Sequence, residues 1–233
     1  MSRKIIRWTL GDVHEDGLEC LRVSIRFAKR IYPECERFVL HNTISHGRLL
    51  GIDANLVEQR HNEEVEYQPW REMWKLYPPR LDTGSHELVL DNDVIIWRRV
   101  PQLDEFWSGD HSVLLAGKAR KYGKYDGLVP AGYVINSGFY GMPPGFDFAS
   151  GIRDAVKRDV SRKWEMWCDD QGIVACCLTK ENHVVVGPST ILNYFPEDRF
   201  DLSYGLCGVH FQGMNRGLRG NWRKLLSKFI ALS

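Results

Sequence analysis

Short apolar runs alternate with longer amphipathic stretches along most of the chain. Ile5–Leu10 has the length of a strand, and the apolar residues from Leu18 onward recur at helical spacing until Pro33 ends the pattern. A second short apolar run covers Arg37–Leu40. Strand, helix and strand in this order are typical of the start of a parallel sheet, so we predict an α/β fold with a mostly parallel central sheet flanked by helices.

The same criteria predict elements along the rest of the chain. We predict strands at Ser112–Ala116, Tyr133–Met142, His183–Gly187 and Gly205–Phe211, and helices within Ile44–Leu56, Trp70–Leu81, Pro101–Trp107, Phe148–Val160 and Trp164–Thr179. Lys118–Pro130 is loop-like and basic. A solvated loop is the favoured interpretation of it, and a lid that closes on a substrate is the alternative.

The segment Glu87–Ile96 contains two apolar runs separated by Asp91, Asn92 and Asp93. Runs this short and rich in β-branched residues are typical of buried strands. Two carboxylates at the end of a buried strand repel each other and are costly to desolvate unless a cation pairs with them. Hard divalent ions prefer oxygen ligands. We therefore predict that Asp91 and Asp93 hold a metal ion, which in turn holds a diphosphate.

In parallel sheets, ligands bind beyond the carboxyl ends of the strands, so the residues that follow each strand share one rim. We expect Gly11, Asp12, His41 and Asn42 to lie on this rim, together with Asp91 to Asp93. Arg80 follows a Pro-Pro turn just before the central strand. Two interpretations of Arg80 stay open: bidentate binding of a phosphate, and an ion pair with Asp91.

Two further polar groups interrupt apolar segments. Asn136-Ser137-Gly138 lies inside a predicted strand, which indicates either a bulge or a close approach to a ligand. Asp169 and Asp170 stand where an apolar helix is predicted to begin. Helix capping is the simpler interpretation of these two carboxylates.

Composition excludes several classes of function. With 43% hydrophobic residues, 26% charged residues and a net charge of +1, the 233-residue chain is typical of a globular domain without a field that would attract nucleic acid. No apolar run approaches the roughly 20 residues of a membrane span, and the N-terminus lacks a signal-peptide core. Six cysteines without a C-x-x-C pair predict reduced, buried thiols in a cytoplasmic protein rather than a zinc site.

The C-terminal segment is basic and has one apolar face. We predict a domain over residues 1–211 and a helix over residues 212–233 that packs on it. The favoured interpretation is a docked helix with a solvated basic face. Peripheral contact with an anionic membrane surface is the alternative.

Four motifs occur in an order that resembles the GT-A nucleotide-sugar glycosyltransferases, most closely their retaining galactosyltransferase and glycogenin-like family. LVLDNDVII resembles the D-x-D strand of the family, INSGF its asparagine-small-glycine strand, DDQGIVA its aspartate-glutamine helix start, and VHFQGMNR its H-x-x-G-x-x-K segment. The motifs span residues 88 to 216. The family usually has lysine where this chain has Arg216, and both side chains are cations.

The resemblance implies a set of site residues. Asp91, Asp93 and His210 would bind Mn²⁺ or Mg²⁺. Manganese accepts an imidazole beside carboxylates more readily than magnesium does. Without the motif series, His210 would be interpreted as a core histidine. The other implied residues are Gly213 and Arg216 at the diphosphate, Thr9, Gly11, Asp12, Arg80 and Asn92 at the donor nucleotide, Asn136 and Ser137 at the donor sugar or the acceptor, and Asp170 and Gln171 near the anomeric carbon.

The function implied by the resemblance is metal-dependent transfer of a sugar from a nucleoside diphosphate sugar, with UDP as the expected nucleotide, to an acceptor hydroxyl on a glycan, lipid or protein. Retention of configuration follows from the same resemblance. A catalytically silent nucleotide- or sugar-binding protein on the same scaffold is the alternative. A nucleotidyltransferase fits poorly, because the segment after the first strand is acidic and not glycine-rich and basic, and the near-neutral charge disfavours a nuclease.

Overall fold

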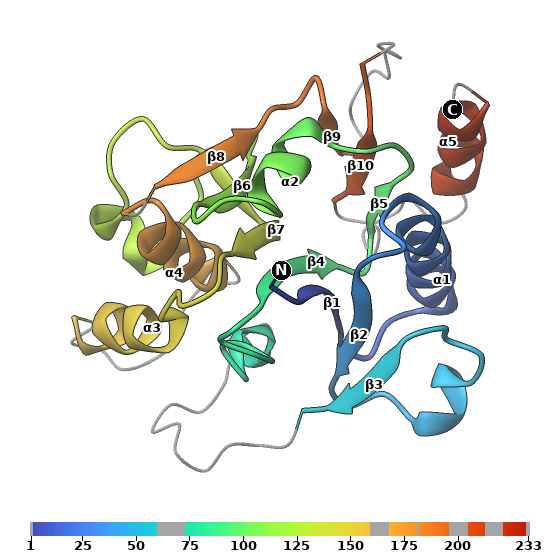
Figure 1. Cartoon of the computed structure of the whole chain (residues 1–233), viewed down its shortest axis with the longest axis horizontal. Helices are drawn as coiled ribbons and strands as arrows, with labels where there is room; N and C mark the ends of the chain where they lie inside the picture. The colour runs from blue at the N-terminus through green and yellow to red at the C-terminus, as the bar shows by residue number, and fades with distance from the viewer. Residues whose placement is uncertain are drawn as a thin grey trace.

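Seven strands form the central sheet, in the order β3-β2-β1-β4-β7-β6-β8 (Figure 1). The structure is a computed structural model that describes residues 2–59, 73–158, 168–180, 182–195, 205–212 and 221–231. The strands are β1 (Lys4–Leu10), β2 (Glu36–His41), β3 (Asn55–Glu58), β4 (His86–Asp91), β6 (Ser112–Ala116), β7 (Ile135–Met142) and β8 (His183–Val186). Both pairings of β7 are antiparallel and the other pairings are parallel, so the predicted mostly parallel sheet is confirmed.

A second sheet of three strands lies beside the first, in the order β5-β10-β9. Its strands are β5 (Val94–Ile96), β9 (Ile191–Tyr194) and β10 (Gly208–Phe211). The two apolar runs around the Asp-Asn-Asp interruption are therefore strands of different sheets, β4 in the large one and β5 in the small one. This arrangement places Asp91, Asn92 and Asp93 at the junction of the two sheets.

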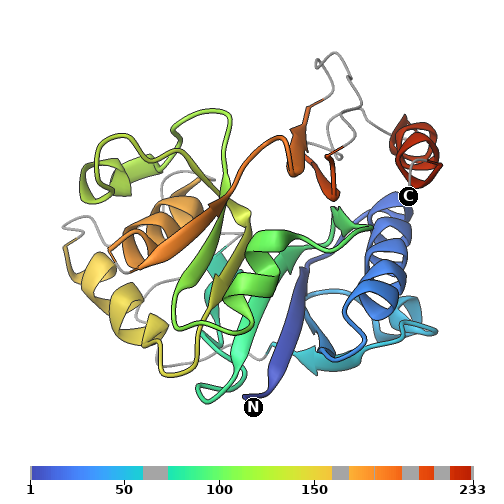
Figure 2. The same ribbon diagram turned by 45° about the horizontal axis from the view of Figure 1, so that its top comes forward.

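Helices cover both faces of the central sheet, as the views in Figures 1 and 2 show. The helices are α1 (Glu15–Ile31), α2 (Pro101–Phe106), α3 (Phe148–Lys157), α4 (Asp169–Leu178) and α5 (Asn221–Ile230), with short 3₁₀ turns η1 (His46–Leu49), η2 (Met73–Leu76) and η3 (Gly123–Leu128). Trp8 and Leu88 pack with α1 and α2, whereas Val89 and Tyr140 pack with α3 and α4. Alternate residues of each strand thus serve opposite cores.

Helix α4 is buried along its whole length. All ten of its residues, Asp169–Leu178, are buried. A helix that is apolar on every side belongs in the interior, because no face of it is suited to water. The predicted helix start at Asp169 is confirmed, and residues 159–167 lie outside the described residues.

Several elements differ from the sequence prediction. The described parts of Ile44–Leu56 and Trp70–Leu81 contain the 3₁₀ turns η1 and η2 where helices were predicted. Asn55–Glu58 forms the edge strand β3 where we predicted the end of a helix and a loop, and Ile191–Tyr194 forms the unpredicted strand β9. Both have only four residues, so they contain too few alternations to show a period of two. The basic segment Lys118–Pro130 contains the 3₁₀ turn η3.

Helix α5 packs on α1 and on the small sheet, and both views place it beside α1 (Figures 1 and 2). Trp222 is buried against Phe211, and Arg223 pairs with Asp16 at 3.0 Å and with Glu19. The described C-terminal residues thus form a helix that packs on α1 and the small sheet, while the division of the chain at residue 211 stays a prediction. None of the described helices is long and apolar enough to span a bilayer, and membrane-surface contact through α5 stays a prediction.

Candidate metal and donor site

The candidate site lies at one rim of the central sheet, at the junction with the small sheet. The parallel strands β1 and β4 end there, with Thr9 in register with Asp91. Because β7 is antiparallel to β4, its first residues lie at the same rim. Strand direction alone therefore brings Thr9, Asp91 and Asn136 to one edge, the rim on which Asp91 was expected.

Asp91, Asp93 and His210 converge at this rim. One potential ligand atom from each lies within 4.8 Å of the other two. His210 Nε2 is 3.3 Å from Asp93 Oδ1. The convergence follows from strand pairing, because β10 runs antiparallel to β5, His210 is in register with Val94, and Phe211 N donates to the carbonyl of Asp93 at 3.0 Å. Residues far apart in the sequence thus become neighbours.

The surroundings of these three side chains fit a divalent cation. Asp93 Oδ1 is buried and makes no hydrogen bond of good geometry with the described residues; its polar neighbour is His210 Nε2 at 3.3 Å, and a cation between the two would satisfy both. The imidazole packs against Gly138 where any larger residue would collide with it, because a Cβ built on Gly138 would lie 2.4 Å from His210 Cε1. Two carboxylates and one imidazole suit Mn²⁺ better than Mg²⁺.

Lys75 is a functional candidate that the sequence analysis missed. Its Nζ lies 3.0 Å from Asp91 Oδ1, and both side chains are partly exposed. Burial opposes the charge on Lys75, but Asp91 and then Asp170 outweigh it and hold the pKa of Lys75 above its ordinary value. Burial likewise opposes the charge on Asp91, yet Lys75 and then His210 hold the pKa of Asp91 below its ordinary value. A lysine just ahead of the Pro-Pro turn was the available signal.

The two polar groups around Asn136 and Asp170 meet at the same rim. Ser137 N donates to Gln171 Oε1 at 3.3 Å, and Ser137 Oγ donates to Asp170 Oδ2 at 3.5 Å. Gly138 N donates to Asn136 Oδ1 at 2.8 Å. The predicted bulge is confirmed, because the register between β6 and β7 shifts here. The start of α4 therefore holds the bulge of β7 beside the metal candidates.

The amide of Gln171 is engaged on both sides. Its Nε2 donates to the carbonyl of Lys121 at 2.7 Å while its Oε1 accepts from Ser137. Asp169, the neighbour of Asp170, accepts from Lys124 N at 3.1 Å, and the N-cap position of the helix is occupied by Cys168. The start of α4 thus also fixes the basic segment Lys118–Pro130.

Arg120 stabilises that basic segment internally. Its guanidinium pairs with Asp126 at 2.8 Å and donates to the carbonyls of Asp126, Val129, Pro130 and Tyr133. The segment is therefore a cross-linked loop rather than a chain of solvated side chains. Closure of this loop over a substrate stays a prediction.

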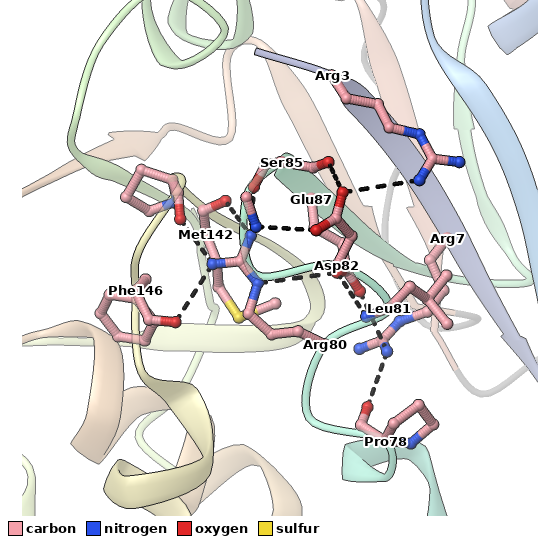
Figure 3. Close-up of polar contacts among 12 residues, drawn as sticks. Arg3, Arg7, Pro78, Arg80, Leu81, Asp82, Ser85, Glu87, Met142 and Phe146 are labelled. Carbon is pink, nitrogen blue, oxygen red and sulfur yellow. Dashed lines mark hydrogen bonds and ion pairs between the residues drawn. The ribbon is translucent and has the colours of Figure 1, made fainter.

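Arg80 does not take either of its predicted roles. Its guanidinium donates to the carbonyls of Pro143 at 2.6 Å, Phe146 at 3.2 Å and Ser85, and lies 3.8 Å from Glu87 Oε2 (Figure 3). Glu87 also pairs with the buried Arg7 at 3.1 Å. The ion pair with Asp91 is wrong, and a phosphate contact does not fit, because both terminal nitrogens of Arg80 already donate to carbonyls and Glu87 supplies its counter-charge. The cation beside Asp91 is Lys75.

The remaining predicted residues take different positions. Thr9 Oγ1 donates to Asp91 Oδ1 at 3.2 Å, whereas Asn92 Nδ2 donates to the carbonyl of Gly17 at 3.1 Å and so ties the turn to α1. Gly11 faces the ring of Trp74, and the exposed Asp12 pairs with Arg48 at 2.9 Å. Gly213 and Arg216 lie outside the described residues.

Comparisons with known proteins identify solved structures with a similar fold, but no family model and no similar curated sequence. No protein-family model and no curated protein sequence matches the chain. Solved structures do match. The galactosyltransferase LgtC, in complex with donor and acceptor sugar analogs, has a TM-score of 0.59 at 16% identity, over 90% of this chain and 87% of that one.

Two further solved structures agree. The bifunctional glycosyltransferase WbbM has a TM-score of 0.61 at 13% identity, over 91% of this chain and 46% of WbbM. A glycosyltransferase involved in glycosylation of the major capsid of PBCV-1 has a TM-score of 0.52 at 13% identity, over 95% of this chain and 99% of that one. The protein therefore has the GT-A-like fold of these glycosyltransferases.

Proposed function

We propose that this protein is a metal-dependent glycosyltransferase that moves a sugar from a nucleoside diphosphate sugar, with UDP as the expected nucleotide, to an acceptor hydroxyl with retention. The convergence of Asp91, Asp93 and His210 beyond the ends of the strands is the observation that carries this proposal. The fold shared with LgtC supports it, because that protein was solved with donor and acceptor sugar analogs.

Different residues of the site would bind the metal ion, stabilise the diphosphate and contact the nucleotide. When bound by Asp91, Asp93 and His210, Mn²⁺ or Mg²⁺ supplies Lewis-acid stabilisation of the charge that develops on the diphosphate. Lys75 adds a second positive charge beside Asp91, 3.0 Å from its carboxylate. Gly213 and Arg216 are proposed diphosphate contacts. Thr9 orients Asp91, while Gly11 and Asp12 line the way to the nucleotide.

The reacting carbon would lie near Asp170 and Asn136. The bond between the anomeric carbon and the diphosphate breaks as the acceptor oxygen bonds to the same face, and the acceptor proton passes to a leaving phosphate oxygen. Asp170, beside Ser137, would stabilise positive charge at the sugar. Gln171 would hold the bulge, because both ends of its amide are engaged.

The test is a transfer assay with a panel of nucleoside diphosphate hexoses and simple glycoside acceptors, with and without Mn²⁺. We expect UDP release and a transferred product only with metal, and NMR of the product should show the anomeric configuration of the donor. Tight binding of UDP with Mn²⁺ but no turnover on any donor would support the silent binding protein instead. An inverted product would contradict retention.

The space at Gly138 gives a second prediction. In Gly138→Ala, the new methyl group would overlap the imidazole of His210, so the ring must leave its present position beside Asp93. We expect Mn²⁺ affinity to fall by about 10- to 100-fold, as when the support of a ligand is lost. Isothermal titration measures this affinity. The matched control is Gly127→Ala, where a Cβ meets no atom within 4 Å, and equal Mn²⁺ binding in both variants would contradict the site.

A further inference from the structure

The second ring nitrogen of His210, which faces away from Asp93, has its own partner. Gln212 lies two residues later in the chain, and its Nε2 is 3.4 Å from His210 Nδ1. The same Nε2 donates to Asn193 Oδ1 at 2.6 Å. The backbone of Gln212 is fixed as well, because its N–H donates to the carbonyl of Tyr194 at 2.9 Å. Gln212 is therefore positioned between the imidazole and strand β9.

The orientation of the Asn193 side chain sets the direction of these hydrogen bonds. Asn193 Nδ2 donates to the carbonyl of Ala116 in β6 at 2.5 Å. A backbone carbonyl only accepts, so Asn193 must turn its amide nitrogen toward Ala116 and its oxygen toward Gln212. Asn193 is buried, so bulk solvent does not reach this bond. Gln212 must then present its own amide nitrogen to Asn193.

This direction decides which nitrogen of the imidazole carries the proton. The amide nitrogen of Gln212 has two hydrogens, one directed to Asn193 and the other available to His210 Nδ1. A ring nitrogen that accepts a hydrogen bond is unprotonated, so the neutral ring carries its proton on Nε2. Nε2 is the atom that lies 3.3 Å from Asp93 Oδ1. A protonated ring nitrogen has no lone pair for a cation.

We propose that Asn193 and Gln212 hold the metal-free imidazole of His210 in the tautomer with its proton on Nε2, so that metal binding requires the Gln212 amide to turn over. Turning the amide over places its oxygen where its nitrogen was, so the oxygen can accept a proton on Nδ1, but it then faces Asn193 Oδ1, which is also an acceptor. Metal binding thus costs the Gln212–Asn193 hydrogen bond, and Gln212 is a positioning residue that weakens the metal site. This inference rests on the metal site of the proposed function.

Imidazole ¹⁵N NMR on the metal-free full chain tests the tautomer directly, at a pH well above the ordinary titration range of histidine. We expect the wild-type His210 signals of a ring protonated at Nε2. In Gln212→Glu the carboxylate can only accept, so the proton should move to Nδ1. His210→Gln assigns the signals, and Gln102→Glu in α2 is the control for added charge. A wild-type ring protonated at Nδ1 would overturn the proposal.

Mn²⁺ affinity gives an independent measurement. In Gln212→Met the side chain keeps its length but donates no hydrogen bond to Nδ1, so it no longer favours the tautomer with the proton on Nε2. Mn²⁺ should then bind about fivefold more tightly, which is the effect of one ordinary hydrogen bond. Gln102→Met should leave the affinity unchanged. Weaker binding in Gln212→Met would overturn the proposal, because Gln212 would then support the ligand. If wild type binds no Mn²⁺, the metal site fails, and the NMR result still decides the tautomer.

Discussion

Replacing Asp91 or Asp93 with asparagine is expected to lower metal-dependent sugar transfer by about 10²- to 10³-fold, the rate equivalent of several kcal/mol of lost charge stabilisation. Asparagine keeps the size of the side chain and removes the charge that binds the cation. The two variants should differ in one respect. Asp91 also pairs with Lys75, so Asp91→Asn leaves that ammonium group without its carboxylate.

Transfer rates at saturating donor and Mn²⁺ binding by isothermal titration measure the two effects separately. Asp53→Asn is the matched control, because Asp53 is an exposed aspartate that pairs with Lys29 outside the candidate site. We expect that control to bind Mn²⁺ and transfer sugar like wild type. Full activity in Asp91→Asn and Asp93→Asn would remove the metal from the proposed mechanism.

The largest effect on stability is expected at Glu87. Its side chain is fully buried between Arg7 and Arg80, and its Oε2 accepts from Leu81 N at 2.9 Å (Figure 3). Glu87→Gln keeps the shape but leaves two arginines in the interior without a counter-charge. Breaking a buried pair in this way costs about 3–5 kcal/mol in the free energy of unfolding.

Urea denaturation measures this change, and Glu36→Gln is the matched control. Glu36 pairs with Arg3 at the surface, where both side chains are nearly half exposed, so its loss should cost no more than about 1 kcal/mol. Equal stabilities of the two variants would show that Arg7 and Arg80 are stabilised mainly by backbone carbonyls. The same network anchors the segment after Lys75, because Arg7 donates to the carbonyl of Pro78 at 2.9 Å.

Local patterns predicted most of the framework. The run Ile5–Leu10, the helix that follows it and the run Arg37–Leu40 form β1, α1 and β2, because period and length are properties of neighbouring residues. The strands β3 and β9 were not predicted, because four residues contain too few alternations to show a period of two. The bulge at Asn136 and the helix start at Asp169 could be predicted because each interrupts an apolar segment with polar residues.

The sequence analysis named the three residues that converge at the rim, but not the lysine that lies beside them. Asp91 and Asp93 are conspicuous in the sequence because two carboxylates end a buried strand, while His210 was included only through the resemblance of four motifs. Arg80 and Lys75 both precede β4, and their charges make them equivalent in the sequence. Their surroundings differ, because Arg80 meets Glu87 and Lys75 meets Asp91.

The sequence by itself determined the class of fold, the order of the main elements and the acidic pair, all of which depend on residues close together in the chain. Only the tertiary structure decided which distant groups meet: His210 with Asp93, Lys75 with Asp91, and Asn193 with Gln212. The physical reason is that strand pairing and burial determine which charged groups and hydrogen-bonding groups become neighbours. Those depend on the whole chain folding at once.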